Sequence, residues 1–260
     1  MEFKISLQES RKEALNTKTF IFSRPQGFDY LAGQYVYLTL PYLNFPDERG
    51  DTRHFTLSSS PTEKYLAITV RLRHSPASQG VALRGQSGFK QTLDSLPKGA
   101  ELSMRGPNGD FVLGNYDATE HTPTAKVAPQ IFIAGGIGVT PFRSIIKYVT
   151  DSAIEVPIML LCSNFVPEEI PFKKELDNTV KKHENLEVIH TITKPKESCV
   201  RWDGLAGRVD GGVIKKLTSE VRQPTYWLCG PPAMVTSVED ILEKMGIPEG
   251  RVKVEKFTGY

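Results

Sequence analysis

The stretch Phe132–Pro141, FIAGGIGVTP, joins an apolar run to a segment that reads as the start of a helix. Its three glycines permit positive φ and let a ligand approach the backbone closely. Pro141 suits the first turn of a helix, where free N–H groups favour a phosphate. From Gly136 the pattern is G-x-G-x-x-P, however, so the third glycine of the dinucleotide fingerprint is absent, and the acid expected about 20 residues later to bind a ribose is also missing. The stretch is therefore either an anion cradle or a tight strand-to-helix turn. If it holds a nucleotide, the contacts are Gly135, Gly136, Gly138, Val139, Thr140 and Pro141.

A second apolar run, YWLCGPPAMV at 226–235, also breaks at a glycine and prolines before a predicted helix. In a parallel sheet, ligands gather outside the carboxyl ends of the strands. The run VPIMLLCSN ends at the same place, and a buried cysteine taken alone is more often a small apolar residue than a functional thiol. The candidate binding residues at these two strand ends are Ser163, Cys229, Gly230, Pro231 and Met234.

Two halves with different patterns must position these residues. Residues 1–113 contain short β-branched or alternating runs separated by turn formers: TFIFSRP, QYVYLTLP, RHFTLSSSP, YLAITVRLR, AELSMRGP and DFVLG. This spacing predicts an antiparallel barrel or sandwich, with one helix over SGFKQTLDSL. Residues 128–260 alternate strands with helical segments, which predicts a parallel sheet covered by helices. The polar segment 114–127 is predicted to be the linker between two domains.

The 260-residue chain has an average composition, with 24% charged residues and a formal net charge of +2. It therefore shows no bulk attraction to nucleic acid. No apolar run reaches the roughly 18–20 residues of a membrane span, and the N-terminus is too polar for a signal peptide, so we expect a cytoplasmic protein. Three cysteines without C-x-x-C spacing predict no disulfide framework and no metal site. Any redox chemistry would then need an organic cofactor.

Four motifs in this order, RHFT (53–56), GGIGVTP (135–141), CGPPAM (229–234) and EKF (255–257), resemble those of the ferredoxin-NADP+ reductase superfamily. The resemblance covers nearly the whole chain. It implies a six-stranded antiparallel flavin barrel followed by a five-stranded parallel nucleotide domain. It also implies that electrons pass between NAD(P)H and an acceptor through a flavin held between the domains.

The resemblance assigns flavin contacts to the first half. Arg53 is a permanent cation whose forked donors suit a phosphate, and Phe55, on the same face of its strand, would lie against the ribityl chain or the ring. By family position the Thr56 hydroxyl would lie near flavin N5, and the strand 68–73 would contact the flavin mainly through its main chain. Ser87 is predicted to cap a helix whose N–H groups face a second phosphate. The expected flavin contacts are Arg53, Phe55, Thr56, Val70, Arg71, Ser87, Gly88, Phe89 and Lys90. Because S-G-F-K resembles the branch of the family that binds the longer cofactor, FAD is expected rather than FMN.

The resemblance also implies a reaction, hydride transfer from the nicotinamide to flavin N5. The nicotinamide would enter beside Cys229, with Glu255 at the edge of the site as a charge or proton partner. Phe257 occupies the position of the aromatic residue that stacks on the flavin ring in the family, although Tyr260 is an alternative because the chain continues past Phe257. The residues expected to act in catalysis are Thr56, Cys229, Glu255 and Phe257.

The choice between NADH and NADPH stays open. Thr193, Lys194 and Lys196, with Arg208 nearby in sequence, would suit a 2′-phosphate but equally describe a solvated loop. The chain shows no fused globin or iron-sulfur domain, so we expect a separate acceptor: a ferredoxin or flavodoxin, an oxygenase component, free flavin, a ferric chelate or a quinone. The alternative is a non-catalytic subunit or regulator that keeps the fold, against which the intact RHFT, CGPPAM and EKF motifs argue.

Overall fold

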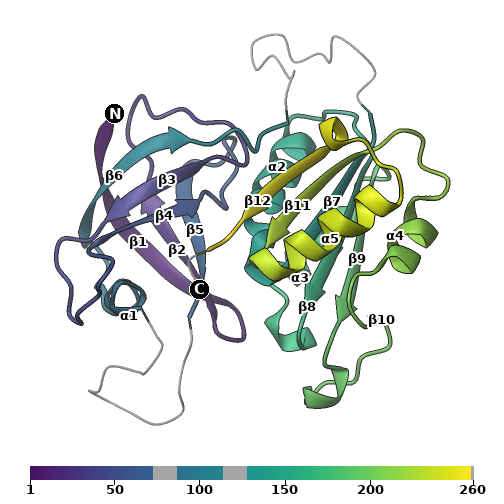
Figure 1. Cartoon of the computed structure of the whole chain (residues 1–260). Coiled ribbons are helices and arrows are strands. Elements are labelled where there is room, and N and C mark those ends of the chain that lie inside the picture. The colour runs from purple at the N-terminus through teal and green to yellow at the C-terminus, as the bar shows by residue number, and fades with distance from the viewer. Residues whose placement is uncertain (73–86, 114–127, 259–260) are drawn as a thin grey trace.

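The computed structural model describes residues 1–72, 87–113 and 128–258. The predicted linker 114–127 and the alternative ring-stacking residue Tyr260 lie outside the described residues. Figure 1 shows two units side by side, a barrel-like antiparallel sheet and a parallel sheet with helices on both faces. The predicted two-domain fold class is therefore confirmed.

The first unit is an antiparallel sheet in the order β4-β3-β6-β1-β2-β5. A bridge between Leu57 and Ile68 brings its two outer strands together. Side chains alternate between the interior and the surface, and the short helix α1 inserts Phe89 and Leu93 into the barrel core. The elements are β1 (Glu2–Ala14), β2 (Thr17–Ser23), β3 (Tyr35–Thr39), β4 (Thr52–Thr56), β5 (Tyr65–Arg71), α1 (Gly88–Ser95) and β6 (Glu101–Asn108).

Two features of this unit differ from the sequence expectation. The longest strand, β1, was not predicted, because only Ile5, Leu7 and Ala14 of its residues are buried, among charged neighbours. The run DFVLG was predicted to be a strand, but its described residues 110–113 form none. Instead Phe111 packs against the second unit, with its ring 5.0 Å from that of Trp227. The apolar residues of this run, Phe111 and Leu113, thus pack against the second unit rather than forming a strand.

The second unit is a parallel sheet in the order β10-β9-β8-β7-β11-β12. Helices α2 and α3 pack on one face and α4 and α5 on the other (Figure 1). The resemblance implied five strands, and the sixth is the two-residue β10. The elements are β7 (Gln130–Gly135), α2 (Thr140–Asp151), β8 (Ile158–Asn164), α3 (Lys173–Val180), β9 (Leu186–Ile192), β10 (Leu205–Ala206), α4 (Gly211–Thr218), β11 (Thr225–Gly230), α5 (Pro232–Lys244) and β12 (Val252–Lys256).

A buried polar contact joins the two units at the start of α2. The Arg143 guanidinium, whose side chain is 7% exposed, donates to the Ser58 carbonyl (3.0 Å) and to the Glu63 carboxylate (3.0 Å) of the barrel unit. It also pairs with Glu175 of α3 at 2.7 Å. The next residue, Ser144, donates its hydroxyl to the Ser59 carbonyl at 2.6 Å. Because unpaired buried charges are costly, this cluster fixes how the units face each other.

None of the helices within the described ranges has the length and apolar character that crossing a membrane requires.

Candidate functional site

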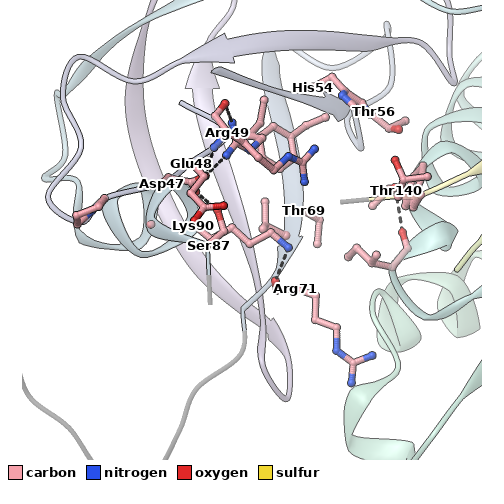
Figure 2. Close-up of a pocket in the computed structure, with 18 residues that line it drawn as sticks. Asp47, Glu48, Arg49, His54, Thr56, Thr69, Arg71, Ser87, Lys90 and Thr140 are labelled. Atoms are coloured by element: carbon pink, nitrogen blue, oxygen red, sulfur yellow. Dashed lines mark hydrogen bonds and ion pairs between the residues drawn. The ribbon is translucent and has the colours of Figure 1, made fainter. Parts of the chain in front are cut away.

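A cavity of about 380 Å³ lies where the barrel unit meets the amino-terminal end of α2 (Figure 2). Both units contribute to its wall. The lining residues are Pro46, Asp47, Glu48, Arg49, Arg53, His54, Phe55, Thr56, Thr69, Val70, Arg71, Ser87, Gly88 and Lys90 from the first unit, and Ile137, Thr140, Phe257 and Thr258 from the second. The sequence motifs RHFT, GGIGVTP and EKF, which are far apart in the chain, thus meet at one cavity.

The predicted convergence of strand ends is also confirmed. Ala134, at the end of β7, is the register partner of Cys229 in β11, and Gly135 is the partner of Ser163 in β8. Adjacent parallel strands therefore place these residues on one edge of the sheet. None of these four residues lines the cavity itself, so a nucleotide that contacts them would lie along the sheet edge beside it.

The three glycines of the 135–141 loop have different roles. The chain forms a short 3-10 helix at Gly136–Val139 and enters α2 with Pro141 in its first turn. A Cβ atom on Gly138 would lie 2.3 Å from the Cys229 carbonyl oxygen, and one on Gly135 would lie 2.3 Å from the Met234 sulfur. These two positions need glycine because the two loops pack together. Ligand contact at all three glycines stays a prediction.

Of the three glycines, Gly136 has the most open surroundings. Its φ is +53°, and a Cβ there would meet only the Arg71 guanidinium, at 3.6 Å. Val139, Thr140 and Pro141 follow it and are buried, with the Thr140 hydroxyl donating to the Ile137 carbonyl at 3.0 Å. The open backbone at Gly136 and the helix start behind it stay the predicted contact for a pyrophosphate.

The buried Cys229 and the half-buried Glu255 lie next to each other at neighbouring strand ends. Cys229 is fully buried, and burial raises the pKa of its thiol well above the ordinary value. Its Sγ lies 4.0 Å from Glu255 Oε2. Burial also raises the pKa of Glu255 to about 7. The cysteine is therefore a neutral thiol at physiological pH, whereas the glutamate can hold or release a proton there.

Phe257 closes the second unit's side of the cavity. Its amide donates to the Gly230 carbonyl at 2.9 Å, which ties the end of β12 to the CGPPAM loop. The half-buried ring packs against the same apolar cluster as Trp227 and Cys229 and lines the cavity. This position is compatible with stacking against a ring system bound in the cavity, the role predicted for Phe257.

The predicted flavin contacts of the barrel separate into two groups. Thr56, Phe55 and Val70 line the cavity from β4 and β5, as expected of ring contacts. The Phe89 side chain is instead completely buried in the barrel core, and Phe89 does not line the cavity. The Arg71 side chain leaves the barrel and pairs with Glu169 of the second unit at 2.6 Å, and Figure 2 shows it directed away from Ser87.

Ser87 does not cap α1, and this expectation was wrong. It occupies the N-cap position, but its hydroxyl makes no bond to the helix and donates instead to Asp47 Oδ2 at 2.6 Å. The same oxygen accepts the Phe89 N–H at 2.9 Å, so the Asp47 carboxylate caps the helix. A serine at the N-cap position would ordinarily accept from the helix N–H groups, but here a carboxylate 40 residues away in the sequence takes that role.

Arg53 also meets this carboxylate. Its Nη2 pairs with Asp47 Oδ1, and its Nη1 donates to the carbonyls of Arg49, Gly50 and Thr52. The Asp47 carboxylate is 6% exposed; burial alone would raise its pKa, but the hydrogen bonds from Phe89 and Ser87 and the charge of Arg53 lower it to about 2. The expected phosphate ligand is therefore engaged by a neighbour in the chain.

The loop 46–49, which no sequence motif marks, supplies much of the cavity wall. Arg49 is the notable member: burial is the main cause that lowers the pKa of Arg53 and of His54, and the nearby positive charge of Arg49 lowers both further. Its guanidinium has no ion-pair partner among the described residues. Residues 46–51, PDERGD, have the composition of an ordinary charged turn, so their sequence does not distinguish them from a solvent-exposed loop.

The donor set in the cavity fits a cofactor that carries phosphate groups. Arg49 and Lys90 supply cations to the cavity wall. Arg53, Ser87 and the start of α1 are donors of the kind that bind phosphate, although here they bind Asp47. Residues 1–72, 87–113 and 128–258 hold no group of three His, Cys, Asp or Glu side chains placed to bind a metal ion.

The residues proposed for a 2′-phosphate lie away from the cavity. Lys194 pairs with Glu197 at 3.0 Å and stacks over the exposed Phe165 ring at 5.5 Å. The Thr193 amide donates to the Asn164 carbonyl at 2.9 Å, which places this loop beside the end of β8.

Comparison with known proteins identifies both units. Residues 4–113 match the oxidoreductase FAD-binding domain, and residues 132–240 match the oxidoreductase NAD-binding domain. The chain is 25% identical, over 95% of its length, to the stachydrine N-demethylase reductase subunit of Rhizobium meliloti, of which it covers 64%. It is 27% identical to NADH-cytochrome b5 reductase 2 of Xenopus laevis, covering 95% of this chain and 86% of that protein.

Among solved structures, a ferredoxin NADP+ reductase from Neisseria gonorrhoeae with bound FAD and NADP superposes with a TM-score of 0.72. The match covers 98% of each chain at 18% identity, and at this identity it shows that the two proteins share a fold. The chain spans less than two thirds of the length of the stachydrine N-demethylase reductase subunit and of a glycine betaine monooxygenase reductase subunit that it also resembles.

Proposed function

Because the chain belongs to the ferredoxin-NADP+ reductase superfamily, we propose that it is an FAD-dependent reductase that takes electrons from NAD(P)H and passes them to a separate acceptor. The observation that carries the proposal is the shared cavity. Barrel residues such as Thr56 and α/β residues such as Thr140 and Phe257 line the same space, so a flavin and a nicotinamide nucleotide would meet there.

A bound FAD would supply the redox chemistry, because its ring can accept a hydride from the nicotinamide and pass the electrons to another molecule. The protein supplies alignment. Gly136 and the start of α2 bind the pyrophosphate of the nucleotide, and the loop after Cys229 limits where its nicotinamide can lie. Phe257 and Thr258 line the cavity from the second unit, where the Phe257 ring can lie against a bound ring system.

Glu255 holds or delivers a proton at the edge of the site. Its pKa of about 7 makes both protonation states available at physiological pH. The neighbouring Cys229 thiol stays neutral because burial raises its pKa, so it acts through shape and polarity rather than as a nucleophile.

The acceptor is a separate molecule in this proposal. The relatives in the comparison include reductase subunits of oxygenase systems and a cytochrome b5 reductase, which points to a protein redox partner. A ferredoxin, flavodoxin or oxygenase component fits this pattern, and free flavin, a ferric chelate or a quinone is the small-molecule counterpart. The cavity's contacts do not favour NADH over NADPH.

An acceptor screen tests the proposal. The protein is loaded with FAD and given NADH or NADPH with a plant-type ferredoxin, cytochrome b5, a ferric chelate, a quinone or free flavin. We expect consumption of one nucleotide that depends on both FAD and an acceptor. The control is the same protein without FAD, which should show none. If the FAD-loaded protein consumes neither nucleotide with any acceptor, the alternative of a non-catalytic subunit replaces this proposal.

A further inference from the structure

Four donors converge on the Asp47 carboxylate beside the cavity. Oδ2 accepts from the Ser87 hydroxyl at 2.6 Å and from the Phe89 amide at 2.9 Å. Oδ1 accepts from the Arg49 amide at 3.0 Å and pairs with Arg53 Nη2. The Asp47 and Arg53 side chains are 6% and 11% exposed. The carboxylate therefore sits in a formed anion cradle rather than on a solvated surface.

These donors are of the kinds that bind phosphate. A guanidinium, a hydroxyl and an amide at the first turn of a helix all favour an anionic oxygen, whichever group carries it. The carboxylate remains ionised at physiological pH, because hydrogen bonds and Arg53 outweigh its burial and lower its pKa to about 2. A phosphate oxygen that used the same donors would have to take the place of Asp47 or lie against its charge.

We propose that Asp47 is an internal occupant of the phosphate position, so that FAD binds by exchange with the carboxylate and Asp47 sets the affinity for FAD. The inference rests on the proposed function, because it takes FAD as the cofactor of this cavity. It goes beyond that function by assigning a competing role to a residue of the loop 46–49, and it gives Arg53 a partner in the flavin-free protein as well as in the bound state.

The surroundings allow the exchange to be local. Gly88 packs so tightly that a Cβ there would lie 2.5 Å from the carbonyls of Phe45 and Pro46, so the start of α1 is held against the loop. Arg49 and Lys90 line the same cavity and supply positive charge toward an incoming phosphate. The movement that frees the cradle is then that of the Asp47 side chain, while α1 keeps its place.

The test compares FAD binding by wild type, Asp47→Asn and Asp51→Asn, each stripped of flavin and titrated by quenching of flavin fluorescence. Asparagine can still accept from the Phe89 amide but carries no charge to compete with a phosphate. We expect Asp47→Asn to lower the FAD dissociation constant about tenfold, which corresponds to about 1.4 kcal/mol. Asp51→Asn removes the same charge from an exposed position just beyond this loop and should change the FAD dissociation constant by less than about twofold.

Thermal unfolding of the flavin-free proteins separates competition from structural support. Competition predicts that Asp47→Asn lowers the unfolding midpoint of the flavin-free protein, because its ion pair is lost, and yet tightens FAD binding. A carboxylate that merely supports the cradle predicts a lower midpoint together with weaker binding. An FAD affinity that is unchanged or reduced in Asp47→Asn would overturn the inference, and Asp47→Ser serves the same comparison if the asparagine variant does not fold.

A second measurement needs no substitution. Carbon NMR of the wild-type protein follows the Asp47 carboxyl group with and without FAD. Exchange predicts that its pKa rises when FAD binds, because Arg53, Ser87 and the Phe89 amide turn to the phosphate; an unchanged pKa contradicts exchange. If neither the wild type nor any variant binds FAD, the proposed function fails, which is a different outcome from FAD binding that is insensitive to Asp47.

Discussion

The Glu255 carboxylate lies 4.0 Å from the Cys229 thiol, Oε2 to Sγ, at the ends of the paired strands β12 and β11. Burial raises the pKa of both groups, that of Glu255 to about 7. Of the two, only the glutamate changes its protonation state near neutral pH. The pair therefore offers one proton site, not two, beside the place predicted for the nicotinamide.

Glu255→Gln should remove a pH dependence from both stability and catalysis. The folded-state pKa of about 7 is above the ordinary value of 4.5, so Glu255 favours folding fully below about pH 4.5 and this contribution is lost as the pH rises through 7. The melting midpoint of Glu255→Gln minus that of the wild type should therefore be larger at pH 8 than at pH 5. We expect the difference in melting midpoint to grow by at least roughly 2–4 °C, the shift that about 1 kcal/mol produces at this size.

Calorimetry at the two pH values checks this prediction, with Glu249→Gln, at an exposed position in the short 3-10 helix Glu249–Arg251, as the control that should follow the wild type. The rate of flavin reduction by the preferred nucleotide should bend near pH 7 in the wild type and not in Glu255→Gln. Parallel stability profiles of variant and wild type would show that Glu255 does not titrate in this range.

Phe257→Ala should alter the environment of a bound flavin, because the Phe257 ring lines the cavity. We expect a shift in the visible absorption of bound FAD and a change of about tenfold in its rate of reduction, equivalent to about 1.4 kcal/mol. Phe257→Tyr keeps a ring at this position and should stay close to the wild type. Stopped-flow absorbance measures both, and an alanine variant with unaltered spectrum and rate would rule out stacking by Phe257.

Gly138→Ala should destabilise the second unit. The added Cβ would lie 2.3 Å from the Cys229 carbonyl oxygen, a backbone atom that cannot move without shifting the CGPPAM loop. We expect a loss of roughly 1–3 kcal/mol in the free energy of unfolding, typical of overpacking, together with weaker nucleotide binding. Gly250→Ala, where nothing lies within 4 Å, is the matched control and should change stability by less than about 0.5 kcal/mol. Urea denaturation distinguishes the two.

Arg143→Met should weaken the contact between the units, because it leaves the Glu63 and Glu175 carboxylates without their buried partner. The expected cost is about 3–5 kcal/mol. Lys147→Met, which breaks an exposed pair with Asp151 on the same helix, should cost less than about 1 kcal/mol.

Unfolding followed by two probes checks the Arg143 prediction. Both tryptophans, Trp202 and Trp227, belong to the second unit, whereas circular dichroism reports on the whole chain. The two transitions should coincide in the wild type and separate in Arg143→Met if the contact couples the units. Coincident transitions in that variant would show that the coupling comes from elsewhere, such as Phe111 and its aromatic partners.

Much of the site was predictable because its residues sit at strand ends. Parallel pairing brings Gly135, Ser163 and Cys229 to one edge of the sheet whatever the details of packing. The alternation of strands and helices in the sequence was therefore sufficient to predict that these residues lie close together. The strand β1 was missed because its outward residues are mostly charged and only three of its residues are buried. Its pairing with β2 and β6 compensates for a weak local pattern.

The cradle around Asp47 was not predictable for a different reason. The local rule for helix capping favoured Ser87, but the distant carboxylate of Asp47 takes that role and binds Arg53 as well. The Arg143 cluster likewise joins residues about 80 positions apart, Arg143 and Glu63. Such partners are chosen by the tertiary arrangement, which leaves no period or spacing in the sequence.

The most direct measurement of the proposed function is the visible absorbance of the FAD-loaded protein on anaerobic addition of NADH or NADPH. The arrangement of Thr56, Thr140 and Phe257 around one cavity predicts that at least one nucleotide bleaches the flavin band stoichiometrically, and that Phe257→Ala changes the rate. A protein that binds FAD but whose flavin stays oxidised with an excess of either nucleotide would contradict hydride transfer in this cavity.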